Sequence, residues 1–148
     1  MKITIGSDHG AVELKDAVKK VLADLKIEIE DVGTFGSDAV DYPDSAEKVC
    51  ANVVSGKSDR GIVLCGTGIG ISIAANKIAG IRCALCNDVY SAKKSREHND
   101  ANVLAMGGRV LGSGLAEEIV RAWISSEFEG GRHECRINKI SALEKNKC

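Results

Sequence analysis

The ten residues GIVLCGTGIG, numbered 61–70, decide the predicted fold. The first five, 61–65, form an apolar run without charges, which is typical of a central strand buried on both faces of a parallel sheet. Three glycines within the next five residues predict a tight turn, and a segment of helical character follows to about Ile78. A buried strand, a glycine-rich turn and a helix form the repeating unit of α/β proteins.

The same alternation of strand and helix patterns continues on both sides of this stretch. Strands are predicted over 2–6, 27–33, 61–65, 81–85 and 102–106, and helices over 11–25, 44–54, 69–78, 89–96, 113–126 and 132–145. Polar alternate positions in 27–33 suggest a sheet edge or a half-exposed face. Five strands separated by helices predict right-handed crossovers. We therefore expect an α/β fold: a Rossmann-like three-layer αβα sandwich with a five-stranded parallel sheet. We expect one domain over 1–148, with a C-terminal helical segment from about 132.

Composition narrows the possible partners. The chain has 148 residues, 20 Lys+Arg and 21 Asp+Glu, so its net charge is -1, and aromatic residues make up 3%. Neither a basic excess nor a set of base-stacking aromatic rings is present, which argues against nucleic acid as a partner. No apolar stretch is long enough to span a bilayer, and the first nine residues lack an export signal. We expect a cytoplasmic protein with reduced cysteines and no membrane partner.

Polar and glycine residues follow every predicted strand. These are Asp8 and His9 after the first strand, residues 41–44 after the second, 66–70 after the third, 87–88 after the fourth and 107–109 after the fifth. Ligands of open parallel sheets bind beyond the carboxyl ends of the strands. The candidate site is therefore expected at this edge.

Two features of the central stretch leave alternatives open. The glycine loop 66–70 suits either anion binding by backbone N–H groups or a plain strand-to-helix turn, and it matches neither a Walker A loop nor a full dinucleotide fingerprint. Cys65 lies directly before the predicted helix, where a thiolate is stabilised and could act as nucleophile or base. A buried cysteine that only fills space is the alternative.

Histidines and arginines supply the remaining candidates. His9, His98 and His133 all fall in polar segments, and each could also be an idle surface residue. Arg109, Arg132 and Arg136 are candidate phosphate ligands because the guanidinium fork fits phosphate oxygens, although a solvated basic face is the alternative. The pair Cys83–Cys86 has the CxxC spacing of redox proteins, but it lies in an apolar, strand-like run without a second pair.

Several motifs together resemble one family. They are GSDHG at 6–10, VDYPD at 40–44, the stretch 61–70 continued by AANK at 74–77, REHN at 96–99, GGR at 107–109, and Arg132-His133 with Arg136. In this order and spacing the chain resembles ribose-5-phosphate isomerase type B, whose family includes the galactose-6-phosphate isomerase subunits. The resemblance extends essentially from end to end.

The resemblance implies an aldose–ketose isomerase of ribose 5-phosphate and ribulose 5-phosphate that needs no cofactor and no metal. Cys65 matches the base that moves the proton, His98 the residue that assists ring opening, and Thr67 could add a hydroxyl contact. Sugar contacts match Asp8, Tyr42 and Asn99, and phosphate contacts match His9, Arg109, Arg132 and Arg136. Backbone N–H groups of Gly66, Thr67, Gly68, Ile69 and Gly70 could stabilise an enediolate. A second branch of the family has a glutamate base at the position of Ile71.

The resemblance also implies a homodimer with shared active sites, in some members paired into a tetramer. Pocket size decides between five-carbon sugar phosphates, six-carbon sugar phosphates and unphosphorylated aldoses, and the sequence does not reveal it. A non-catalytic phosphate-binding module would use the same glycine loop without needing Cys65 and His98. A thiol redox protein built on Cys83 and Cys86 is the third class.

Overall fold

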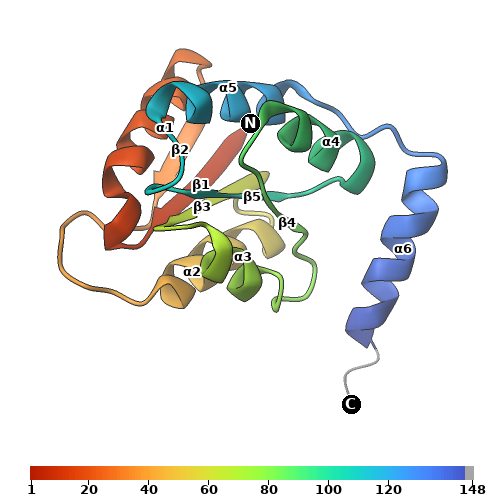
Figure 1. Ribbon diagram of the computed structural model, residues 1–148. Helices are drawn as coiled ribbons and strands as arrows, with labels where there is room; N and C mark the ends of the chain where they lie inside the picture. Colours follow the sequence, from red (N-terminus) through yellow and green to blue (C-terminus); the bar gives the residue numbers. More distant parts are fainter. Residues whose placement is uncertain (146–148) are drawn as a thin grey trace.

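Five parallel strands form one sheet in the order β2-β1-β3-β5-β4 (Figure 1). The computed structural model describes residues 1–145. The strands are β1 (Lys2–Ser7), β2 (Glu28–Asp31), β3 (Arg60–Cys65), β4 (Cys83–Leu85) and β5 (Val103–Gly107). The helices are a short 3-10 helix η1 (His9–Ala11) and α1 (Val12–Asp24), α2 (Tyr42–Val54), α3 (Ile69–Ala75), α4 (Val89–Asn99), α5 (Ser113–Ser125) and α6 (Arg132–Lys145).

Helices cover both faces of the sheet. Figure 1 shows α1, α4 and α5 on one face and α2 and α3 on the other. The alternation of side chains along β3 serves both layers: Ile62 and Leu64 join the apolar cluster under α1 and α5, and Val63 and Cys65 join the cluster under α2 and α3. All six residues of β3 are buried. The expected three-layer αβα sandwich with a buried central strand is therefore confirmed.

The strand order creates a crevice between β1 and β3. The chain passes from β1 to β2 on one side and then crosses to β3 on the other side of β1. Ser7 pairs with Leu64 and Cys65 pairs with Gly107, so the three central strands end at nearly the same level. Loops that leave neighbouring strands in opposite directions separate at such a point and leave space for a ligand.

Three helix boundaries differ from the sequence prediction by two or three residues. Helix α2 begins at Tyr42, two residues earlier than expected, because Pro43 fits the first helical turn. Helix α4 continues through Asn99, so His98 lies in its last turn rather than in a connecting segment. Helix α3 ends at Ala75 instead of about Ile78, because the side-chain amide of Asn76 pairs with the backbone N–H and C=O of Cys83 in β4.

The C-terminal helix stands apart from the sandwich. In Figure 1, α6 lies beside the β4 edge and extends away from the sheet. It packs mainly against α4, and its side chains Ile140 and Leu143 are exposed. The helical segment expected from about 132 corresponds to α6. Over residues 1–145, the structure contains no helix long and apolar enough to cross a membrane.

Candidate functional site

Three loops at the carboxyl ends of β1, β3 and β5 are joined by backbone hydrogen bonds. The N–H of Asp8 donates to the carbonyl of Leu64 at 3.0 Å. The N–H groups of Gly108 and Arg109 donate to the carbonyls of Cys65 and Gly66, both at 2.9 Å. Residues that are far apart in the sequence are thus fixed around the glycine loop, as expected from the ends of parallel strands.

Two glycines make this close approach possible. Gly68 has a positive φ of 77°, which disfavours other residues, and a Cβ atom there would lie 2.6 Å from Cδ1 of Leu85. A Cβ atom at Gly107 would lie 2.6 Å from the carbonyl carbon of Thr67. The glycine loop can therefore lie directly against the end of β5 only because neither residue has a side chain.

The Cys65 thiol lies under the glycine loop. Cys65 is 4% exposed, and its Sγ atom accepts a hydrogen bond from the backbone N–H of Gly68 at 3.1 Å. This hydrogen bond fixes the sulfur against the start of the helix that follows the loop. The hydroxyl oxygen of Thr67 accepts a bond from the N–H of Ile69 at 3.3 Å, so the hydroxyl proton of Thr67 remains available as a donor.

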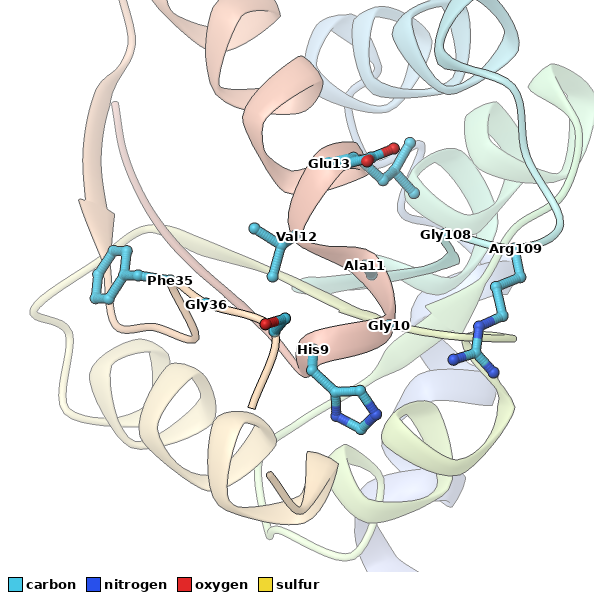
Figure 2. A pocket seen from close by; sticks show the side chains of 11 residues that line it. His9, Gly10, Ala11, Val12, Glu13, Phe35, Gly36, Gly108 and Arg109 are labelled. Atoms are coloured by element: carbon cyan, nitrogen blue, oxygen red, sulfur yellow. The ribbon is translucent and has the colours of Figure 1, made fainter. Parts of the chain in front are cut away.

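A cleft of about 460 Å³ opens beside this loop. Figure 2 shows the imidazole of His9 and the guanidinium of Arg109 pointing to the same side of Gly10. The cleft continues past them to Phe35 and Ser37, but Cys65 does not line it. Nδ1 of His9 accepts a hydrogen bond from the N–H of Val40 at 3.3 Å, which leaves Nε2 to carry a proton and donate to an anion.

Asp8 and Tyr42 lie on other sides of the glycine loop 66–70. One carboxylate oxygen of Asp8 accepts a bond from the N–H of Gly10 at 2.8 Å and caps the short helix that begins at His9. Tyr42 covers the start of α3, because a Cβ atom on Gly70 would lie 2.8 Å from the tyrosine hydroxyl oxygen. The structure therefore brings Asp8, His9, Tyr42, Cys65, Arg109 and the loop 66–70 together.

The other predicted site residues lie elsewhere. Helix α4 runs back from the end of β4 toward the start of β5, so His98 and Asn99 lie at the edge where the strands begin. The guanidinium of Arg82, just before β4, donates to the carbonyl of Asn99 at 3.0 Å. Arg132 and Arg136 are exposed on α6, which packs on α4. Within one chain, these four residues are separated from Cys65 by the length of the sheet.

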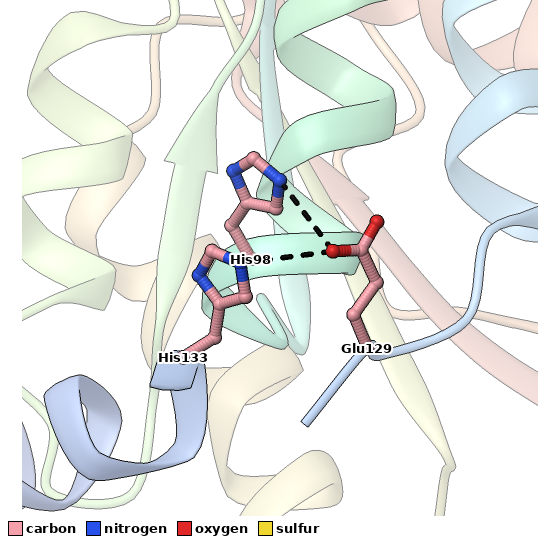
Figure 3. A group of neighbouring side chains, drawn as sticks. All are labelled: His98, Glu129 and His133. Atoms are coloured by element: carbon pink, nitrogen blue, oxygen red, sulfur yellow. Dashed lines mark ion pairs between the residues drawn. The ribbon is translucent and has the colours of Figure 1, made fainter. Parts of the chain in front are cut away.

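His98 has close neighbours of its own (Figure 3). Its ring stacks on that of His133 with centroids 4.2 Å apart and planes 7° from parallel. The Oε2 atom of Glu129 lies 3.8 Å from Nε2 of His98 and 3.6 Å from Nε2 of His133. His133 is buried in the first turn of α6, so it is not the idle surface residue that the sequence had left open. Its burial, and then the nearby His98, Arg132 and Arg136, lower its pKa.

These three side chains are also the group that best approximates a metal site in residues 1–145, because their ligand atoms lie within 4.8 Å of one another. A lone pair on an imidazole nitrogen lies in the plane of its ring. Two nearly parallel, stacked rings do not direct their lone pairs at one ion. The arrangement therefore favours proton chemistry over metal ligation.

Comparison with known proteins decides the family. The ribose/galactose isomerase family profile matches residues 3–140. The chain is 49% identical to ribose-5-phosphate isomerase B of Escherichia coli over 146 residues, which cover 99% of this chain and 98% of that protein. The chain belongs to the ribose/galactose isomerase family.

Solved structures agree with this assignment. Ribose-5-phosphate isomerase B of Clostridium thermocellum superposes with a TM-score of 0.98 at 55% identity, with 100% of each chain covered. The Mycoplasma genitalium enzyme, solved with bound ribulose-5-phosphate, superposes with a TM-score of 0.93 at 38% identity, covering 99% of this chain and 97% of that one. The family resemblance and the fold expected from the sequence are both confirmed.

The sequence analysis missed two features of this isomerase-family chain: the carboxylate of Glu129 beside the two histidines, and the residues Phe35 and Ser37 that line the cleft. Glu129 received no role, because it precedes Gly130-Gly131 and the glycine pair indicated only a chain break. Glu129 lies outside any helix and reaches His133 through the reversal at the two glycines, so no periodic pattern in the sequence marks it. Phe35 and Ser37 line the cleft from a loop whose sequence has no distinctive pattern.

The remaining cysteines do not form a redox site in the described chain. Cys83 and Cys86 are free thiols, and burial raises the pKa of both, that of Cys86 to about 11. Thiols held protonated in this way are poor nucleophiles. Cys50 is also buried, and burial raises its pKa to about 12. Cys148 lies outside the described residues.

Proposed function

We propose that this chain interconverts ribose 5-phosphate and ribulose 5-phosphate through an enediolate, with Cys65 as the base. The observation that carries this proposal is the position of the thiol. It lies at the end of β3 and accepts the Gly68 N–H bond, under a loop in which Gly66 lies against Arg109 and Gly70 against Tyr42. Close similarity to ribose-5-phosphate isomerases B supports the choice of substrate.

Cys65 acts twice in the proton transfer, first as a thiolate that takes a proton and then as a thiol that returns it. Cys65 takes the proton from C2 of the open-chain aldose, and the electrons of that C–H bond form the enediolate. A proton then moves from the C2 oxygen to the C1 oxygen, and Cys65 returns its proton to C1 to give the ketose. The cysteine ends as it began, so the cycle needs no oxidant or reductant.

The glycine loop supplies the groups that hold the enediolate. The N–H of Gly68 is bonded to the thiol and that of Ile69 to the Thr67 hydroxyl, which leaves Gly66, Thr67 and Gly70 as the backbone donors we assign to the substrate oxygens. The Thr67 hydroxyl can donate to the same oxygens. Donors fixed in place before the reaction stabilise developing negative charge without reorganisation.

A homodimer completes the site in this proposal. His9 and Arg109 bind the phosphate from one chain, and Asp8 and Tyr42 contact the sugar. The partner chain provides His98 for ring opening, Asn99 for the sugar, and Arg132 and Arg136 for the phosphate. The separation of these two groups within one chain, together with the exposed side chains of α6, supports a shared site. Because the substrate is a phosphorylated metabolite, we also propose a cytoplasmic setting.

The test is a comparison of substrates and cysteine variants. Purified protein should convert ribose 5-phosphate to ribulose 5-phosphate with a higher kcat/KM than it shows for allose 6-phosphate or for ribose. Cys65→Ala should lower turnover by about a thousandfold or more while substrate still binds. Cys135→Ala, which removes an exposed thiol, should keep wild-type turnover. Unchanged turnover in Cys65→Ala would reject the base, and absence of conversion by wild type would reject the activity.

A further inference from the structure

The chain between α5 and α6 is built to place one carboxylate beside the α4 terminus. The backbone N–H of Glu129 donates to the carbonyl of Glu97 in the last turns of α4 at 3.0 Å. Gly130 and Gly131 then both adopt positive φ, 65° and 56°, and reverse the chain. The N–H of His133 bonds to the carbonyl of Gly130 at 3.1 Å, which starts α6 with His133 against His98.

Two side chains, those of His133 and Glu129, lie against the imidazole of His98. Its ring has one face covered by the parallel ring of His133 at 4.2 Å. The Oε2 atom of Glu129 lies 3.8 Å from Nε2 of His98 and 3.6 Å from Nε2 of His133. Both distances are too long for a hydrogen bond, so the carboxylate acts on the rings through its charge. One carboxylate can balance one positive charge, so the pair of imidazoles is suited to hold one proton between them.

We infer that Glu129 and His133 are positioning residues for ring opening: they fix the ring of His98, and the carboxylate favours the proton on it. This inference rests on the proposed role of His98. It adds two residues to which the sequence analysis gave no task in the reaction, and it explains why the glycine reversal brings His133 back onto α4.

The two rings differ in burial. The side chain of His98 is 32% exposed, whereas that of His133 is 6% exposed. Burial lowers the pKa of His133, and the charges of His98, Arg132 and Arg136 lower it further against the opposing effect of Glu129. His133 is therefore the less favourable place for a proton.

The carboxylates in the last turns of α4 already have cationic partners. Arg96 pairs with Asp100 at 2.8 Å, and Glu97 accepts from Lys94 at 2.6 Å and lies 3.5 Å from Lys93. Glu129 is thus the carboxylate whose charge is directed at the imidazoles.

The step assisted by this proton is the cleavage of the furanose ring. The imidazolium of His98 gives a proton to the ring oxygen, and the electrons of the bond between C1 and that oxygen move to the oxygen. The hydroxyl group on C1 loses its proton to water, and its O–H electron pair forms the carbonyl double bond. A neutral imidazole is a far weaker acid and supplies this proton much less readily.

Ring opening can be measured alone in the Cys65→Ala background, because this variant should not isomerise the sugar. Opening and reclosing interconvert the α and β anomers of ribose 5-phosphate, and exchange NMR spectroscopy measures the rate above that of free substrate. In this background, we expect Glu129→Gln to lower the enzyme-dependent exchange about three- to tenfold at pH 7.5 and by less at pH 6, because a lower pH restores the proton. His133→Asn should also lower it.

Glu134→Gln in the same background is the matched control, since it removes an exposed carboxylate from the first turn of α6 and should leave exchange unchanged. A Glu129→Gln rate equal to that of Glu134→Gln, or a defect that does not depend on pH, would overturn the inference. The proposed function fails differently: if His98→Ala leaves the exchange unchanged, His98 does not open the ring at all.

Discussion

Two regions hold the candidate residues, and they are constructed on different principles. The crevice comprises Asp8, His9, Cys65, Arg109 and the loop 66–70 at the carboxyl ends of the strands. It is fixed mainly by the backbone, because N–H groups of one strand-end loop bond to carbonyls of the next and glycines permit the close contact. The thiol itself accepts a backbone donor. Such a site is rigid and well suited to a reaction whose charge develops at fixed atoms.

The corner comprises His98, Glu129, Arg132, His133 and Arg136, where α6 packs on α4 at the opposite edge of the sheet. It is fixed mainly by side chains, through the stacked rings and the central carboxylate. Its arginines are exposed on a helix that stands away from the sandwich. In our proposal the crevice supplies the base and the corner supplies the acid, so the two regions would meet across two copies of the chain.

Mixing two inactive variants tests this division with the largest expected effect. Cys65→Ala alters the crevice and His98→Ala alters the corner, so each homodimer should be nearly inactive. In a mixed dimer both defects fall in one site and leave the other intact. After subunit exchange of equal amounts, turnover should rise from near zero to about a quarter of the wild-type value, because half of the dimers carry one intact site out of two.

The control for this experiment is the double variant Cys65→Ala/His98→Ala. Mixed with either parent it forms no intact site and must stay inactive. If exchange is verified by mass spectrometry and the two single variants still show no recovery, crevice and corner of the same chain act together, and the shared site is wrong.

The same contrast explains how far the sequence could be interpreted. The place of the crevice could be predicted from the sequence. An uncharged apolar run that ends in Cys65 and continues into a glycine loop identifies a buried strand and the sheet edge where this strand ends. The corner could not be located in this way. Periodicity ended the fourth helix at about 96, but the structure continues it to Asn99, and this turn carries His98 to the far edge. Glu129 acquires its position from two positive φ angles, which depend on tertiary packing as well as on glycine.

The next largest effect is expected on phosphate binding, and it tests whether the corner contributes to the substrate site. Arg136→Ala should raise KM for ribose 5-phosphate about tenfold or more, because a guanidinium–phosphate contact is strong where charges are removed from water. The KM for unphosphorylated ribose should change little. Lys139→Ala removes another exposed cation from α6 and should affect neither substrate. Equal losses on both sugars would show that Arg136 is structural.

Backbone construction of the crevice predicts a stability effect at Gly107. An added methyl group would lie 2.6 Å from the carbonyl carbon of Thr67, which belongs to the backbone and cannot turn aside. Gly107→Ala should therefore destabilise the fold by about 1–3 kcal/mol in urea denaturation and should also reduce kcat. Gly114→Ala, where the added methyl meets open space at the start of α5, should be neutral or slightly stabilising. Equal unfolding midpoints for the two variants would show that the loop has room to move.

The smallest effect is a pH dependence of stability that belongs to the corner. Burial, with His98, Arg132 and Arg136 nearby, lowers the pKa of His133 in the folded protein below its ordinary value of 6.5. Below about pH 6.5 the unfolded chain therefore binds a proton at this residue more readily than the folded chain, and stability falls as the pH is lowered through this range. Replacing the residue in His133→Asn should make the decline between pH 6.5 and 5.5 shallower, measured as urea midpoints at several pH values. An unchanged slope would mean that His133 accepts a proton as readily in the folded corner as in the unfolded chain, and the assignment of the shared proton to His98 would lose its physical basis.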